Sequence, residues 1–125
     1  MDRLLPGQLV EHDNPIVSNN GAYELVVQGD SNLVLYRTAD HVPLWASNTD
    51  NGLEGAALVM QEDGNLVLYG AYIVSFDPNT PTTREVLWAS GTDGRVGSYL
   101  VMQDDGNAVV YYPTYPVWAS NTVQG

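Results

Sequence analysis

The sequence predicts an all-β protein, and three observations support this. Apolar and polar residues alternate with a period of two, as in a strand with one buried face. Valine and tyrosine are frequent, and turn-forming stretches such as SNNG, DGN and DPNT separate the alternating segments. No stretch keeps an apolar period of 3.6 residues long enough for a helix, so we expect strands joined by turns throughout the chain.

The chain contains three internal repeats. ELVVQGDSNLVLY at 24–36 returns as ALVMQEDGNLVLY at 57–69 and as YLVMQDDGNAVVY at 99–111. A second motif follows each copy, as WASNTD, WASGTD and WASNT. A unit this short cannot bury its own apolar face, so the three copies must share a core. We predict a single domain over residues 1–125 with three repeats of about 1–50, 51–93 and 94–125.

Each repeat contains a predicted β-hairpin whose loop length fixes which side chains share a face. We take Asp63-Gly64-Asn65 as a three-residue loop, which pairs Glu62 with Leu66 and Gln61 with Val67. A two-residue loop would put Gln61 and Val67 on opposite faces. An odd loop therefore leaves one face of the hairpin apolar and the other face polar.

Applied to all three copies, this register predicts two sets of residues. The inner face holds apolar side chains only: Leu25, Val27, Leu33, Leu35, Leu58, Met60, Leu66, Leu68, Leu100, Met102, Ala108 and Val110. The outer side repeats one set of five residues: Gln28, Asp30, Asn32, Val34 and Tyr36; Gln61, Asp63, Asn65, Val67 and Tyr69; Gln103, Asp105, Asn107, Val109 and Tyr111.

This outer set suits a neutral polyhydroxy ligand. Gln, Asn and Tyr both donate and accept hydrogen bonds, an ionised Asp accepts them, and Val offers a small apolar contact. The same residues are also ordinary turn and strand formers, and duplication alone would preserve them. Turn chemistry does not explain why Gln and Tyr recur at fixed positions, so we favour a binding site.

One tryptophan follows each hairpin, at Trp45, Trp88 and Trp118. Three equivalent aromatic residues most simply meet on a pseudo-threefold axis as shared core. A stacking platform for sugars is the alternative. The small residues after each Trp favour close packing, and we predict the core.

Composition excludes several classes of partner. The net charge is −11, with four arginines and no lysine, so the chain repels phosphate backbones and anionic membranes. We expect no nucleic acid and no membrane insertion. The chain has no cysteine and therefore no disulfide. MDRLLPGQLV has no apolar signal region, so we expect a cytoplasmic protein or one released without a recognisable leader.

The Q-x-D-x-N-x-V-x-Y motif, present three times with W-A-S-[NG]-T after each copy, resembles the monocot mannose-binding (bulb-type, snowdrop-type) lectin family. The resemblance covers essentially the whole chain. It implies a β-prism II fold: three four-stranded antiparallel sheets with pseudo-threefold symmetry. It implies that Asp and Asn hold the 2-hydroxyl of terminal α-D-mannose, Gln the 3-hydroxyl and Tyr the 4-hydroxyl, with Val against the ring carbons.

The family also implies an assembly, and the chain departs from the family at two points. The C-terminal strand of similar lectins exchanges with a partner, so we predict a homodimer. Plant members usually carry an intrachain disulfide, which this chain lacks. The second repeat is longer by residues 70–85, where Tyr72–Phe76 could form a strand and Asp77–Thr80 a turn. This insertion could add glycan contacts or an interface, or be a plain surface loop.

Other functional classes are less well supported. No pair of acids outside the repeats suggests glycosidase chemistry, and both histidines, His12 and His41, are expected in loops, so we predict no catalysis and no cofactor. DDGN and EDGN lack calcium-loop spacing, so we predict no metal. A lectin-like antibacterial or defence protein, acting mainly by cell-surface targeting or protein interaction, is the alternative to simple binding of mannose-rich glycans.

Overall fold

The protein is an all-β chain in the computed structural model, which describes residues 1–73 and 84–124, with only the backbone of 71–73. The described chain holds twelve strands and no helix. It therefore contains no helix long and apolar enough to cross a bilayer. The strands are β1 (Arg3–Leu4), β2 (Leu9–Glu11), β3 (Ile16–Val17), β4 (Tyr23–Val27), β5 (Leu33–Arg37), β6 (Val42–Ala46), β7 (Ala57–Met60), β8 (Leu66–Ile73), β9 (Arg84–Ala89), β10 (Tyr99–Met102), β11 (Ala108–Tyr112) and β12 (Tyr115–Ala119).

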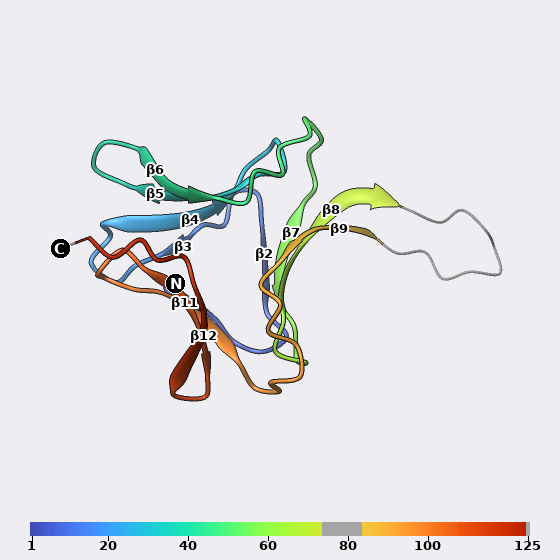
Figure 1. The fold of residues 1–125 in the computed structure, drawn as a ribbon. Coiled ribbons are helices and arrows are strands. Elements are labelled where there is room, and N and C mark those ends of the chain that lie inside the picture. Colours follow the sequence, from blue (N-terminus) through green and yellow to red (C-terminus); the bar gives the residue numbers. More distant parts are fainter. Residues whose placement is uncertain (74–83, 125) are drawn as a thin grey trace.

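The strands form three four-stranded antiparallel sheets, ordered β3-β4-β5-β6, β2-β7-β8-β9 and β1-β10-β11-β12. Figure 1 shows the sheets as the three sides of a prism around a common axis. In each sheet a hairpin supplies the two middle strands and the tryptophan segment supplies one edge. The predicted β-prism II architecture is confirmed.

The fourth strand of every sheet comes from the N-terminal segment. β1 pairs with β10, β2 with β7 and β3 with β4. The first seventeen residues therefore run along all three sheets and tie them together. These strands are only two or three residues long, which is too short to show an alternating pattern in the sequence.

The predicted hairpin pairings are wrong, because each residue after the loop pairs with a residue two positions earlier than predicted. The predicted faces are right. Met60 pairs with Leu66, and Val59 pairs with Val67, instead of Glu62 with Leu66 and Gln61 with Val67. The three-residue loop is Glu62-Asp63-Gly64, because Gly64 takes the left-handed conformation (φ +94°) at the third loop position. Both loops are odd in length, so the same side chains share a face.

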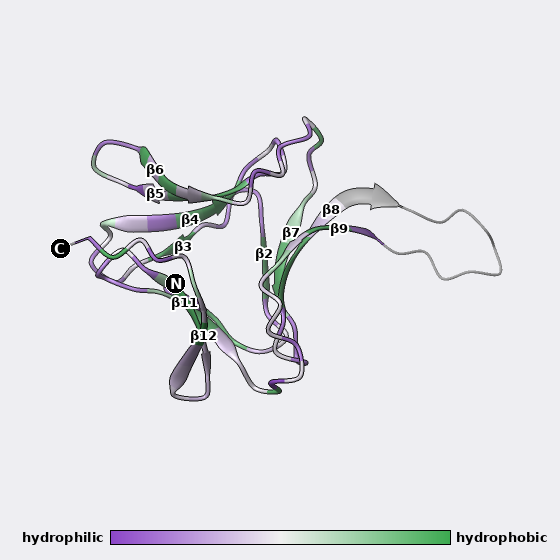
Figure 2. Cartoon of the chain, in the orientation of Figure 1, coloured by the Kyte–Doolittle hydropathy of each residue, from purple (hydrophilic) through white to green (hydrophobic). Residues whose placement is uncertain are grey.

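The inner faces of the sheets meet in one core. All twelve residues predicted to face inward are buried, with exposed fractions of 2 % or less. Figure 2 shows hydrophobic colour along the inner strands and hydrophilic colour in the outer turns. Leu4, Val10 and Ile16 from the three N-terminal strands join the same core. The N-terminal segment therefore contributes one apolar side chain to the core from each of its strands.

The three tryptophans lie together, as predicted for the shared core. Trp45 and Trp88 have ring centroids 5.3 Å apart, Trp88 and Trp118 5.3 Å, and Trp45 and Trp118 5.5 Å. Interplanar angles of 70–75° make every pair edge-to-face, which is favourable for aromatic rings. The rings are partly buried and pack against the apolar core. Because the rings come from β6, β9 and β12, their contact connects one edge strand of each sheet to the other two.

The insertion in the second repeat begins as an extension of its hairpin. β8 runs on to Ile73, which pairs with Arg84 at the start of β9, after irregular register beyond Tyr69. The predicted strand Tyr72–Phe76 is thus present as far as Ile73. The rest of it, and the predicted turn Asp77–Thr80, lie outside the described residues.

We expect Trp88→Ala to lower the free energy of unfolding by about 3 kcal/mol, because it removes one ring from the three-way contact and leaves a cavity. Urea unfolding followed by circular dichroism measures this loss. Val96→Ala, at a residue 73 % exposed, is the control and should change stability by less than about 0.5 kcal/mol. Equal stability of the two variants would contradict a central role for the ring.

Candidate functional site

The fifteen predicted site residues form three separate groups, one on the outer side of each sheet. Each group surrounds the loop of one hairpin: β4–β5, β7–β8 or β10–β11. We call them the first, second and third sites. The Val residue of each site lies on the outer face yet is only 3 % exposed, and the Asp residue of each is exposed. Each site is therefore a small apolar floor with polar groups around it.

The Gln and Tyr of each site are hydrogen-bonded to each other. The amide nitrogen Nε2 donates to the phenol oxygen in all three pairs: Gln28 to Tyr36, Gln61 to Tyr69 and Gln103 to Tyr111. Because the phenol oxygen accepts this bond, its own hydrogen can still be donated to a ligand. The amide keeps Oε1 as an acceptor and a second N–H as a donor.

The Asp of each site braces the hairpin loop with one carboxylate oxygen. Its Oδ1 accepts the backbone N–H of the Asn two residues later, at 3.0 Å in the first site, 2.9 Å in the second and 3.0 Å in the third. This is the usual turn hydrogen bond of an Asp side chain. No described residue donates to Oδ2, which remains able to accept from a ligand.

The Asn of each site is held by the W-A-S-x-T segment on the neighbouring strand. Its Oδ1 accepts from the Ser Oγ at 3.0–3.2 Å and from the Thr backbone N–H at 3.2–3.3 Å. In the second and third sites, the residue between Ser and Thr adds a further N–H bond. These bonds orient the amide so that its Nδ2 has no partner among the described residues.

Sequence reasoning missed these serines and threonines: it treated the serines as small packing residues and gave the threonines no role. The Ser Oγ also accepts the N–H of the residue after the site Asn. The Thr Oγ1 donates to the carbonyl of the last loop residue. The signal was present, because Ser and Thr recur unchanged in every copy of the motif: Ser47 and Thr49, Ser90 and Thr92, Ser120 and Thr122.

The last loop residue adopts a left-handed conformation in every site: Ser31 (φ +74°), Gly64 (φ +94°) and Gly106 (φ +91°). At Gly64 an added Cβ would lie 2.2 Å from the backbone oxygen of Arg95, so no larger residue fits there without movement. The second loop is thus fixed by close approach of the backbone as well as by its φ angle.

Together the three sites offer the same chemistry. Each presents a carboxylate acceptor, an amide donor, a second amide that both donates and accepts, and a phenol donor, all beside one buried Val. A vicinal diol both donates and accepts hydrogen bonds, so this mixture matches it. No residue of the set is paired with a base that would make it a nucleophile. The described residues contain no group of three or more His, Cys, Asp or Glu that could hold a metal ion.

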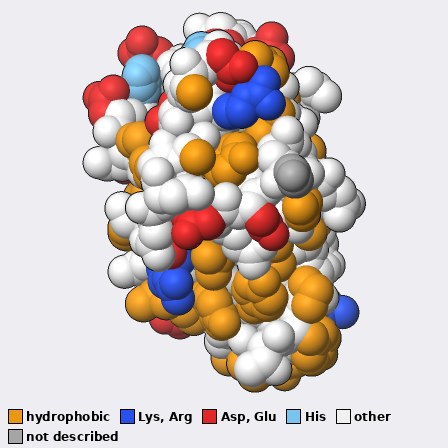
Figure 3. All heavy atoms as spheres, turned by 90° about the vertical axis from the view of Figure 1, so that its left-hand side faces the viewer, with side chains coloured by type: hydrophobic (Ala, Val, Ile, Leu, Met, Phe, Trp, Pro, Cys, Tyr) orange, Lys and Arg blue, Asp and Glu red, His pale blue; other side chains and the backbone are white. Residues whose placement is uncertain are grey.

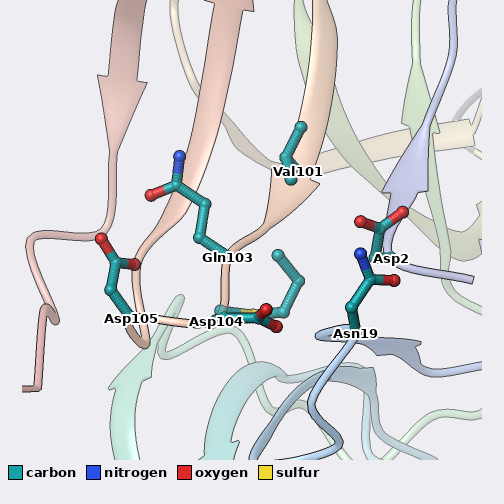
Figure 4. A pocket seen from close by; sticks show the side chains of 7 residues that line it. Asp2, Asn19, Val101, Gln103, Asp104 and Asp105 are labelled. Carbon is teal, nitrogen blue, oxygen red and sulfur yellow. The ribbon is translucent and has the colours of Figure 1, made fainter.

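Shallow grooves adjoin two of the sites. One, of about 370 Å³, lies beside Gln103 and Asp105 of the third site and is also lined by Asp2, Asn19 and Asp104. Figure 4 shows these polar side chains around the space, with Val101 above it. Hydrogen bonds from Arg3 hold the pKa of the Asp2 carboxyl below its ordinary value, so Asp2 lines the groove as a carboxylate paired with Arg3. A groove of about 500 Å³ adjoins Gln28 and Asp30 of the first site.

The tyrosines of the three sites have different aromatic neighbours. Tyr36 in the first site stacks on His41, with centroids 4.0 Å apart and planes at 8°. Tyr111 in the third site stacks on Tyr99, at 5.8 Å and 30°. Tyr69 has no such neighbour among the described residues. The sites are therefore equivalent in their five residues and different in their surroundings.

We expect Ser120→Ala to lower the free energy of unfolding by about 1–3 kcal/mol, because it leaves the buried N–H of Ala108 without an acceptor. Thermal or urea unfolding measures the loss. Thr114→Ala, an exposed position in the same repeat, should be close to neutral. A neutral Ser120→Ala would mean that the Ser hydrogen bonds do not hold the site loop.

Comparison with known proteins agrees with the geometry, although no family model matches the chain. A mannose-specific lectin from Aloe arborescens is 37 % identical over 121 residues, covering 97 % of this chain and 98 % of the relative. A monomeric monocot mannose-binding lectin from Gastrodia elata superposes with a TM-score of 0.81 at 34 % identity, covering 100 % and 99 % of the two chains.

Snowdrop (Galanthus nivalis) agglutinin complexed with methyl-α-D-mannoside superposes with a TM-score of 0.72 at 32 % identity, over the full length of both chains. The three sheets, the repeated site motif and the similarity to the Aloe lectin over nearly the full length of both chains agree with one another. The chain belongs to the monocot mannose-binding, or bulb-type, lectin family.

Proposed function

We propose that the protein is a lectin that binds terminal α-D-mannose and mannose-rich glycans, without catalysis, at three sites. The observation that carries this is the repetition of one arrangement. In every copy the hydrogen bonds within the protein use one polar atom each of the Gln, Asp and Asn side chains and leave the other without a partner among the described residues, beside a Val that is 3 % exposed. A scaffold alone would not need the same unused groups to recur three times.

The unused groups suggest a role for each residue. Asp Oδ2 accepts from the mannose 2-hydroxyl, and Asn Nδ2 donates to it. The Gln amide binds the 3-hydroxyl, and the Tyr hydroxyl binds the 4-hydroxyl. The Val side chain packs against ring carbons. The proposed residues are those of the three sites: Gln28, Asp30, Asn32, Val34 and Tyr36; Gln61, Asp63, Asn65, Val67 and Tyr69; Gln103, Asp105, Asn107, Val109 and Tyr111.

A single site should bind weakly. Each hydrogen bond to the sugar replaces a bond to water and contributes little net free energy. A dissociation constant of millimolar order, about −4 kcal/mol, is therefore expected for one monosaccharide. The three proposed repeats, of about residues 1–50, 51–93 and 94–125, would give the chain three sites, and simultaneous binding to a branched glycan strengthens the interaction by about 10²–10⁴.

We expect the triple variant Asp30→Ala, Asp63→Ala, Asp105→Ala to lose binding to a mannan-coated surface by at least about tenfold, since each change removes the charged acceptor. Surface plasmon resonance measures this, with galactose-coated resin as the specificity control. Each single variant should lose binding at one site only in a titration followed by NMR. A folded wild-type protein that ignores mannan would refute the proposal.

We also propose a homodimer formed by exchange of the C-terminal strand. β12 pairs with β11 of its own chain, and the same pairs could form with β11 of a second copy. The side chains that β12 would carry across, Val117 and Trp118, are partly buried apolar groups. The alternative is a monomer, because each sheet already has four strands from one chain, and the Gastrodia relative is described as monomeric.

Light scattering after size exclusion distinguishes these assemblies. We expect twice the chain mass of 13.6 kDa. Exchange also predicts that the dimer, once separated, returns to equilibrium slowly after dilution, because β12 must leave one sheet before it joins another. A single species at 13.6 kDa at all concentrations would contradict the dimer and leave mannose binding untouched.

A further inference from the structure

One position on the outer face differs between the three otherwise equivalent sites. It lies four residues before the site Gln and is Glu24 in the first site, Ala57 in the second and Tyr99 in the third. In every sheet this residue pairs directly across the hairpin with the site Tyr. Residues that face each other in this way on an antiparallel pair have their side chains in contact distance.

The third site alone has an aromatic ring there. The Tyr99 ring lies 5.8 Å from the Tyr111 ring at an angle of 30° and is partly exposed. Ala57 in the second site is only 2 % exposed and offers no comparable surface. Glu24 in the first site adds a charge to the same position. In the first site the aromatic neighbour of the site tyrosine is His41, which comes from the turn after β5 and not from this position. Only in the third site does the residue paired across the hairpin with the site tyrosine carry an aromatic ring.

Tyr99 is part of a continuous row of outer-face residues. Tyr99, Val101 and Gln103 alternate along β10, and the Val101 and Gln103 end of this row borders the groove of about 370 Å³ in Figure 4. Arg3 pairs with Val101 on the neighbouring strand, and its charge is balanced by Asp2. The surface beside the third site is thus open, shallow and without a net positive charge.

The third repeat is rich in tyrosine beyond this face. Tyr112 and Tyr115 pack edge-on at the tip of the β11–β12 hairpin, with centroids 5.9 Å apart, and Tyr115 is 55 % exposed. Figure 3 shows hydrophobic side chains gathered at the lower end of this side of the molecule, at the height of that hairpin in Figure 1. The rings of Tyr112 and Tyr115 belong to the hairpin tip, and only Tyr99 contacts the tyrosine of the third site among the described aromatic pairs.

An aromatic ring beside a sugar site has a specific use. One face of a pyranose carries several C–H groups, which pack on the face of an aromatic ring, while the hydroxyls point outward to water or to polar groups. Tyr suits this because its ring is rigid and its hydroxyl can hydrogen-bond at the edge.

We infer that Tyr99 makes the third site an extended site, which holds a second pyranose ring of an oligosaccharide next to the mannose bound by Gln103, Asp105 and Tyr111. This inference rests on the proposed function. It assigns to the third site a preference for oligosaccharides that depends on the Tyr99 ring. A role for Tyr99 in bracing Tyr111 alone would instead affect every ligand of the site, the monosaccharide included.

The test isolates the third site in an Asp30→Ala, Asp63→Ala background and titrates it with methyl-α-D-mannoside and with α-linked mannobiose and mannotriose, followed by NMR. We expect the third site to bind an oligosaccharide about threefold to tenfold more tightly than the monosaccharide. Tyr99→Ala should abolish that difference and leave monosaccharide affinity unchanged. Tyr99→Phe, which keeps the ring, should preserve it.

Glu24→Tyr gives a matched gain-of-function test, because residue 24 pairs with Tyr36 as Tyr99 pairs with Tyr111. With the other two sites inactivated, it should give the first site the same preference. Equal loss of monosaccharide and oligosaccharide binding in Tyr99→Ala, or an unchanged oligosaccharide preference, would overturn the inference while mannose binding stands. Absence of monosaccharide binding in the unmutated protein would instead overturn the proposed function itself.

Discussion

The sites depend on one interaction, the set of hydrogen bonds between each site Asn and the W-A-S-x-T segment of the neighbouring strand. The Asn carbonyl oxygen accepts two or three bonds there, and the Ser and Thr hydroxyls bond the backbone of the loop. No buried side-chain nitrogen or oxygen lacks a partner in the described chain. The hydrogen bonds that satisfy these buried polar groups therefore also fix the orientation of the site Asn side chain.

This interaction links binding to the core. In each W-A-S-x-T segment the Trp packs in the three-ring contact. The Ser two residues later and the Thr four residues later hold the site loop. A shift of one tryptophan segment would move a site loop with it. The N-terminal segment adds a strand to every sheet, so no repeat can fold as a complete sheet without residues 1–17. The three sites are thus parts of one cooperative unit.

Much of this could be predicted from sequence, and the failures have physical causes. Alternation gave the strands, and the odd loop gave the faces, because face assignment needs only the parity of the loop. The exact pairing at Met60 and Leu66 required knowing that the left-handed residue is the third of the loop, Gly64. The N-terminal strands could not be recognised in the sequence, because strands of two or three residues are too short to show an alternating period. The roles of Ser90 and Thr92 depended on a neighbouring strand, which local patterns do not reveal.

Differences among the repeats follow from the same network. Site residues and the Ser and Thr that hold them each have several partners, so changing one leaves others unsatisfied. The position of Glu24, Ala57 and Tyr99 touches the site only through the tyrosine ring opposite, and no hydrogen bond of the loop passes through it. It can change without cost to the loop. Variation at this position therefore lies around the five repeated site residues rather than within them, so three sites with the same five residues can differ in the surface beside them.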